Sequence, residues 1–181
     1  MKKLFALMLL LPALSKAQQP VDTTTSRTRI YQTMYSEVGL YEKNSYDLSY
    51  KSNIRFTAYI VKNIRTNESI KGVWMYSGSY FTGSLPASYL DEIEIKEIIA
   101  TMSFIKDSVD ITKNPDHDTY IYYNTVDKLE VGVKARKGKD YQVYFRKKKL
   151  YTVDEETVDI KYLLDIYNAL VSAAAFLDAH H

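Results

Sequence analysis

The spacing of apolar residues changes from alternation to a helical repeat twice along this chain, and this constrains the fold more than any other feature. In the segment 54–64, apolar and polar side chains alternate, as in a strand with one buried face. In the segment 91–107, apolar residues recur every three or four positions, as along one side of a helix. Alternation returns after residue 118, and a second helical pattern follows to about Ala179. The sequence therefore predicts strands and then a helix, in the same order twice.

Turn signals divide the alternating segments into candidate strands. In the first half, the polar run TNES separates segments 54–64 and 69–77, which predicts a hairpin. The second half contains three candidate strands joined by polar turns, over residues 119–125, 128–136 and 140–148. The segment 30–50 is ambiguous, because its pattern fits either a strand pair or a short helix.

Both helical segments have sequence signals for a helix start. Asp91 and Glu94 have the spacing of a capping box, in which the two residues satisfy free N–H groups of the first turn. Thr152 and Glu155 have the same spacing before the second helical segment, and acidic residues surround them. Acidic side chains at a helix N-terminus complement the helix dipole, which accounts for both acidic clusters without a catalytic role.

The two halves of the chain also resemble one another. KEIIATMSFI aligns with KYLLDIYNAL at an offset of 65 positions. This similarity predicts a duplicated strand–strand–strand–helix unit, over residues 54–107 and 119–179. The alternative is coincidence, because amphipathic helices share much of their composition.

These patterns predict the α+β fold class. Alternating strands suit an antiparallel sheet with one face buried and the other in water. We expect a twisted antiparallel sheet of about six to eight strands, with the two amphipathic helices packed on one face. A small barrel closed around the helices is the alternative.

The N-terminus has the pattern of a secretory signal peptide. Lys2 and Lys3 precede an uncharged apolar run over residues 4–14, and the small residues Ser15 and Ala17 follow. The run is shorter than the ~20 apolar residues that a membrane-spanning helix needs. We therefore expect an exported protein, periplasmic or extracellular, that does not span the membrane.

This assignment sets the expected domain boundaries and charge. The signal peptide covers residues 1–17, a polar flexible leader covers 18–28, and a single α+β domain covers 29–181. The chain carries a net charge of +2, of which three lysines of the signal peptide contribute +3, so the remainder is close to neutral. The chain has no cysteine, which excludes thiol catalysis, disulfides and cysteine-ligated zinc.

One stretch, KARKGKDYQVYFRKKK over residues 134–149, contains eight Lys or Arg. With a turn over 137–140, most of these cations lie on the face opposite the apolar residues. The stretch is then the solvated face of a hairpin, or it binds an anionic partner. Nucleic acid is not expected, because the exported chain is near neutral. The candidate binding residues are Lys134, Arg136, Tyr144, Arg146 and Lys148.

Signals for catalysis or cofactor binding are weak. His117 is the only internal histidine, in the loop sequence NPDHD, and adjacent loop residues rarely converge on one metal ion. The sequence contains no Gly-rich phosphate loop, no nucleophile elbow and no HExxH pair. We therefore predict no catalytic residue, no metal and no cofactor.

The favoured function is that of an exported binding or accessory protein. Its Tyr-rich strands would recognise a protein, a peptide or an envelope component through a sheet face or edge, and an anionic surface is a further possible partner. Two alternatives remain open. One is an extracytoplasmic hydrolase that uses His117 with a distant carboxylate. The other is a structural or assembly subunit of the envelope, whose N-terminal strand pairs with a neighbouring chain.

Overall fold

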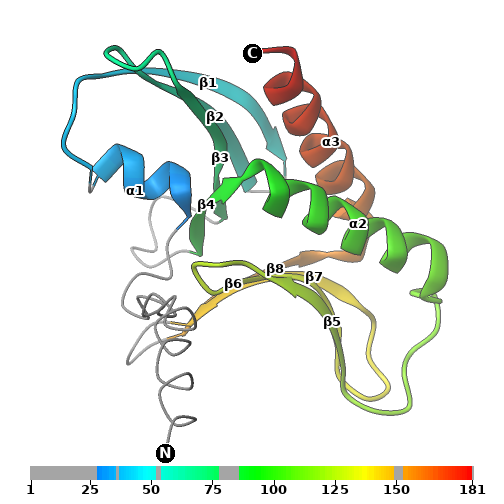
Figure 1. The fold of residues 1–181 in the computed structure, drawn as a ribbon. Coiled ribbons are helices and arrows are strands. Elements are labelled where there is room, and N and C mark those ends of the chain that lie inside the picture. Colours follow the sequence, from blue (N-terminus) through cyan, green and yellow to red (C-terminus); the bar gives the residue numbers. More distant parts are fainter. Residues whose placement is uncertain (1–27, 36, 52–53, 78–85, 149–152, 181) are drawn as a thin grey trace, which may run out of the picture.

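The protein has an α+β fold, which confirms the predicted class. The computed structural model describes residues 28–35, 37–51, 54–77, 86–148 and 153–180. Within these residues, eight strands form two four-stranded antiparallel sheets, and three α-helices accompany them (Figure 1). The predicted signal peptide and nearly all of the leader, residues 1–27, lie outside the described residues.

The strands of each sheet follow one another in chain order. Sheet A contains β1 (Tyr41–Lys51), β2 (Ile54–Asn63), β3 (Ser69–Ser77) and β4 (Ala87–Asp91). Sheet B contains β5 (Thr119–Asn124), β6 (Leu129–Ala135), β7 (Gln142–Lys148) and β8 (Val153–Asp159). The helices are α1 (Arg29–Tyr35), α2 (Glu92–Ser108) and α3 (Leu163–Ala179), and the 3-10 helix η1 (Ile160–Tyr162) leads into α3.

The expected single sheet is therefore wrong, and so is the alternative of a closed barrel. Neighbouring strands pair only within each group of four in the described chain. The physical reason is the position of α2, which lies between the sheets and contacts β3 and β4 on one side and β5 and β6 on the other (Figure 1). A helix about 10 Å wide prevents the two sets of strands from joining.

Three strands were not predicted, and β8 shows why. Its acidic run was interpreted as the first turn of a helix, but Asp154 and Glu155 pair in strand register with Lys147 and Arg146 of β7. The helical region begins later, where Asp159 accepts a hydrogen bond from the backbone N–H of Lys161. Each half thus has four strands followed by a helix, and the proposed duplication of the sequence stays a prediction.

The ambiguous segment 30–50 contains both kinds of structure. Helix α1 packs on the face of sheet A that points away from the core, and β1 then pairs along β2. Ile30 of α1 is fully buried against Gly72 of β3, where a Cβ atom would lie 3.0 Å from the Ile30 side chain. The missing side chain at Gly72 therefore lets α1 approach the sheet closely.

One hydrophobic core joins the two halves. It contains the inward-facing residues of both sheets and the buried sides of α2 and α3. The helix of the second half covers the sheet of the first, because α3 contacts β1, β2 and β3. Lys71 of β3 donates a hydrogen bond of 2.7 Å to the carbonyl of Leu177 near the C-terminal end of α3, where a cation complements the helix dipole.

The segment Ile160–Ala179 is the one helical stretch among the described residues that is long and apolar enough to cross a membrane by length and composition. Its buried side includes Ile166, Leu170, Ala173 and Leu177, all of which belong to the shared core. The apolar character of this helix thus has a structural explanation within the fold.

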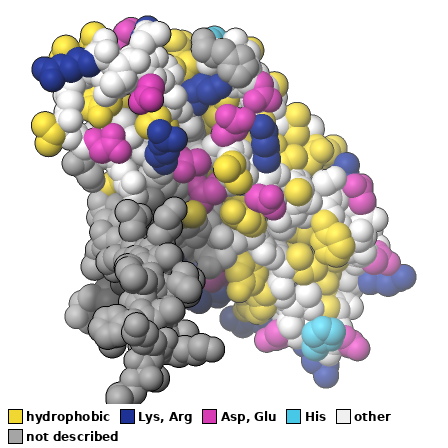
Figure 2. Space-filling view, in the orientation of Figure 1, with side chains coloured by type: hydrophobic (Ala, Val, Ile, Leu, Met, Phe, Trp, Pro, Cys, Tyr) yellow, Lys and Arg dark blue, Asp and Glu magenta, His cyan; other side chains and the backbone are white. Residues whose placement is uncertain are grey.

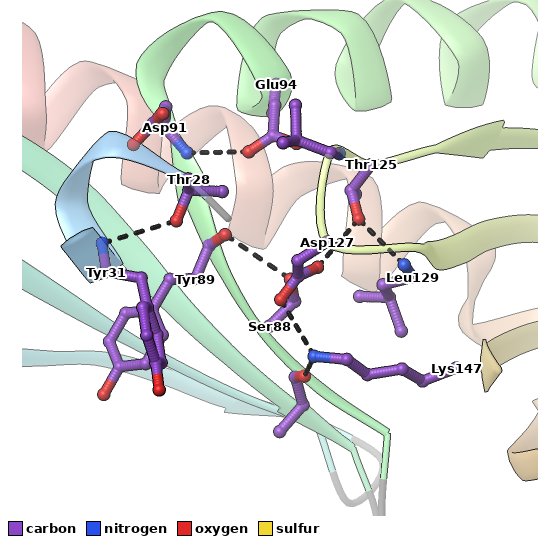
Figure 3. Close-up of polar contacts among 12 residues, drawn as sticks. Thr28, Tyr31, Ser88, Tyr89, Asp91, Glu94, Thr125, Asp127, Leu129 and Lys147 are labelled. Carbon is purple, nitrogen blue, oxygen red and sulfur yellow. Dashed lines mark hydrogen bonds and ion pairs between the residues drawn. The ribbon is translucent and has the colours of Figure 1, made fainter. Parts of the chain in front are cut away.

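Two carboxylates connect α1, α2 and sheet B where the two halves meet (Figure 3). The Asp91 carboxylate accepts hydrogen bonds from the backbone N–H groups of Arg29 and Ile30 at the start of α1, at 2.9 and 3.1 Å. The Glu94 carboxylate accepts one from the Asp91 N–H at 3.0 Å and one from the Val126 N–H at 2.7 Å. The predicted capping box of α2 is therefore confirmed, and Glu94 also holds the β5–β6 turn.

A second polar group lies beside this one in Figure 3. The Asp127 carboxylate accepts hydrogen bonds from the hydroxyls of Ser88 and Thr125 and pairs with the Lys147 ammonium at 2.8 Å. Lys147 also donates to the carbonyl of Ala87 at 2.6 Å. These contacts tie β4 of sheet A to the β5–β6 turn and to β7 of sheet B.

The buried Glu94 carboxyl makes stability depend on pH. Burial raises the pKa of Glu94 above its usual value, against the effect of its two N–H donors. The folded protein therefore binds the Glu94 proton more tightly than the unfolded chain does. Protonated Glu94 makes its full contribution to the free energy of unfolding below the ordinary pKa of a glutamate, and this contribution is lost as pH rises through the raised pKa of the folded state. We expect Glu94→Gln, which cannot titrate, to lower the free energy of unfolding by about 1–3 kcal/mol near pH 4 and by less near pH 8.

Urea unfolding at both pH values measures this difference. Glu97→Gln, which removes an exposed carboxyl from the same helix, is the control and should change stability by less than about 1 kcal/mol at either pH. A cost of Glu94→Gln that stays constant with pH would contradict the argument.

The shared core predicts one unfolding transition for both sheets. Leu170→Ala removes a fully buried side chain of α3 and should cost about 2–5 kcal/mol. We expect the fluorescence of Trp74, in sheet A, and far-UV circular dichroism to shift together. The neighbouring change Val171→Ala, at a position 39% exposed, should cost less than about 1 kcal/mol. Two separate transitions would show that the sheets fold independently.

Candidate functional site

The outer face of sheet B is the face that points away from α2 and the core (Figure 1). Val131, Val133, Val143 and Phe145 point inward and are fully buried, and the residues between them point outward. The predicted faces of the hairpin are therefore confirmed over residues 131–146. The strand register arranges the outer face in three rows: Tyr120, Lys134, Gln142, Asp159; Tyr122, Gly132, Tyr144, Thr157; and Asn124, Glu130, Arg146, Glu155.

Three tyrosines form a cluster on this face. Tyr144 is fully buried, and the exposed rings of Tyr120 and Tyr122 meet it edge-on, with centroid distances of 6.0 and 6.2 Å. Between Tyr122 and Tyr144 lies Gly132, where a Cβ atom would be 2.0 Å from the carbonyl oxygen of Ile121. The absence of a side chain at Gly132 therefore permits the close approach of β5 and β6 beneath the rings.

A buried carboxylate, Glu130, orders the cations around these rings. It accepts a hydrogen bond of 2.7 Å from Nε of Arg146 and a second from its terminal nitrogen, pairs with Lys148 at 3.2 Å, and accepts from the Tyr144 hydroxyl at 3.3 Å. Burial raises the pKa of Tyr144, and the negative charge of Glu130 adds to the effect. The Arg146 guanidinium in turn lies 5.6 Å from the ring centres of Tyr120 and Tyr144, within range of a cation–π attraction.

Two further cations of the stretch are paired with carboxylates, one on the acidic strand β8 and one in the β5–β6 turn. Lys134 pairs with Glu155 on the outer face, and Lys147 pairs with Asp127 on the inner side. The interpretation of the acidic run as a complement to a helix dipole is thus corrected, because these acids lie beside the cations of β7. Of the five candidate binding residues, Lys134, Arg146 and Lys148 have acidic partners, and Tyr144 is buried.

A cleft of about 560 Å³ lies at the end of the outer face nearest the β6–β7 turn. We call it the turn cleft. Arg136 and Lys139 line it without an ion pair to any described residue, whereas Lys134 is held by Glu155. The complete lining is Tyr120, Lys134, Ala135, Arg136, Lys139, Asp140, Gln142 and Glu155.

The sequence predicted that most of these cations lie on the outer face, but it did not identify the residues around them. It did not single out Glu130, Glu155 or Lys139 as parts of the site. The alternation of faces was the available signal for Glu130, because it puts Glu130 and Arg146 on the same, outer face; the strand register then pairs them. Glu155 could not be found in this way, because β8 itself was not predicted.

His117 lies in the loop between α2 and β5, and its side chain is 78% exposed. Its Nδ1 atom is 2.5 Å from a carboxylate oxygen of the adjacent Asp116. His117 lines neither the turn cleft nor the second cleft, of about 550 Å³, between Ile111 and Lys161. Among the described residues, no group of three His, Cys, Asp or Glu side chains is placed to hold a metal ion.

A second surface is formed by α2 and α3, where hydrophobic side chains gather between acidic and basic ones (Figure 2). The helices run antiparallel, since Lys96 lies 3.8 Å from Asp178 and Lys106 lies over the ring of Tyr167. The exposed apolar residues of this surface are Ile93, Phe104, Leu164 and Val171.

No protein-family model matches this chain, and a search of curated proteins finds no similar sequence. A function for this chain is therefore inferred from its own geometry. Within that geometry, the outer face of sheet B combines exposed aromatic rings, ordered cations and a cleft.

The role of Glu130 can be measured by removing its charge. Glu130→Gln leaves the partly buried guanidinium of Arg146 without its counterion, so we expect a loss of about 1–3 kcal/mol in the free energy of unfolding. Glu155→Gln removes the partner of Lys134 at a more exposed site and should cost less than about 1 kcal/mol. Denaturant unfolding compares the two variants, and equal costs would show that Glu130 has no special ordering role.

Proposed function

We propose that this protein is an exported binding protein that recognises an envelope component through the outer face of sheet B. The observation that carries the proposal is the arrangement of Tyr120 and Tyr122. Their rings are 46% and 43% exposed, yet each is set edge-on against a buried third ring. A flat aromatic surface held in one orientation loses little conformational entropy when a partner binds.

Electrostatics supports the same face. Glu130 and Glu155 hold Arg146, Lys148 and Lys134 in fixed positions, so the outer face is ordered and only weakly charged. A nucleic-acid surface would instead present many unpaired cations to phosphate groups. The pattern thus favours a partner recognised by ring stacking and a few directed polar contacts.

The alternatives have less support from the described residues. A hydrolase using His117 needs a concave site around that residue, and His117 lies on an exposed loop outside both clefts. Assembly through an N-terminal strand would have to use the outer edge of β1, because β1 is already paired along β2 on its inner edge. Location outside the cytoplasm is supported by the signal-peptide pattern of residues 1–17.

Site-specific photo-crosslinking tests the proposed face. The photoreactive amino acid benzoylphenylalanine would replace Tyr122 in one variant and Phe104, 56% exposed on α2, in a control. After incubation with an envelope fraction and irradiation, we expect adducts at position 122 and not at position 104. Adducts confined to position 104, or none at position 122, would assign binding elsewhere and refute the proposal.

A further inference from the structure

We propose that the turn cleft binds a short acidic oligosaccharide, a chain of uronic-acid residues. The inference rests on the proposed function, since it assigns a ligand class to part of the same outer face. It is carried by the chemistry of the lining, which combines two available cations, three acceptors of hydroxyl hydrogen bonds and one exposed aromatic ring.

The cations supply the contacts for carboxylates. Arg136 and Lys139 flank the β6–β7 turn, and neither makes an ion pair within the part of the chain that the structure describes. Both backbones are fixed, because the Lys139 N–H donates to the Arg136 carbonyl at 2.9 Å. An arginine fork can bind a carboxylate through two parallel hydrogen bonds, and a lysine adds a point charge.

The acidic residues of the cleft select against simple anions. Asp140 and Glu155 line the same space as the cations, so their carboxylates oppose a densely charged polyphosphate more strongly than a uronate chain, which carries one charge per sugar ring. They accept hydrogen bonds from hydroxyl groups, however, and the amide of Gln142 can both donate and accept. A ligand that carries several hydroxyls along with its carboxylates satisfies both sets of groups.

The exposed ring of Tyr120 provides a surface on which a sugar ring can stack. Its edge contact with Tyr144, with the rings at 90°, fixes its orientation, and a flat apolar surface with a polar tip suits the C–H face of a pyranose. The cleft volume of about 560 Å³ lies in the ~300–1,000 Å³ range of small-ligand sites.

An acidic peptide fits this lining less well. Protein and peptide partners are usually anchored by an apolar side chain that enters a fully desolvated pocket. The turn cleft offers the Tyr120 ring as its apolar surface, since Ala135 belongs to the buried core, and its other six lining residues are polar. The polar lining therefore favours a hydroxyl-rich ligand over a peptide.

Isothermal titration calorimetry of the purified chain with trigalacturonic acid tests the inference. We expect saturable binding that weakens about tenfold or more in the double variant Arg136→Gln/Lys139→Gln. The matched control is Lys137→Gln, in the same turn but outside the cleft lining, where affinity should change less than about twofold. Lys137 contacts Asp118 through its backbone N–H, so the control keeps the turn intact.

Two further ligands separate the possible outcomes. Maltotriose, a neutral trisaccharide, should bind at least about tenfold more weakly than trigalacturonic acid. A blocked triglutamate peptide that binds as tightly as trigalacturonic acid would overturn the oligosaccharide assignment in favour of an acidic peptide. No binding of trigalacturonic acid at millimolar concentration would overturn it outright. Adducts at position 122 in the crosslinking experiment would still support the outer face, so failure of this inference is distinguishable from failure of the proposed function.

Discussion

The apolar layer shared by the two sheets is the constraint on which the rest of the structure depends. Strand residues from both halves and the buried sides of α2 and α3 form one continuous core. Because apolar burial is the dominant favourable term in folding, this layer fixes the inner face of each sheet. The polar and aromatic residues of alternating strands must then lie on the outer faces. The position of the candidate site on the outer face of sheet B follows from this requirement alone.

Charge on the outer face is organised by the order of strands in the meander. The cation-rich β7 lies between β6, which contributes Glu130, and the acidic β8. Segments with opposite charge thus become neighbours as soon as the strands pair. Like charges directly opposite one another would destabilise the pairing, whereas opposite charges support it. The same neutralisation that stabilises the sheet leaves Arg136 and Lys139, beside the turn, without an acidic partner among the described residues.

Local sequence patterns predicted the helices and strands that have clear periodicity. They failed where one pattern is compatible with either a helix or a strand. The alternation of β2, β3, β5, β6 and β7 and the helical repeats of α2 and α3 were sufficient to find these elements. The acids of β8 resemble a helix N-terminus, so only their register against β7 reveals a strand. The separation into two sheets depends on the position of α2 between them, which cannot be predicted from the spacing of apolar residues in the sequence. At the site, the outward cations were predictable from alternation, but the contribution of Glu155 depended on a strand that was missed.

The packing of α3 on sheet A has a consequence for how the chain acquires its structure. A polypeptide emerges from the ribosome with its N-terminus first, so all four strands of sheet A exist well before the last helix is made. Until Leu170 and its neighbours appear, the inward residues of that sheet have no cover from α3. The first half therefore cannot complete its fold early. Under the proposed export, a chain that is threaded through a translocation channel in an extended state gains from such a delay, because the structure that would block passage forms only after α3 has been made.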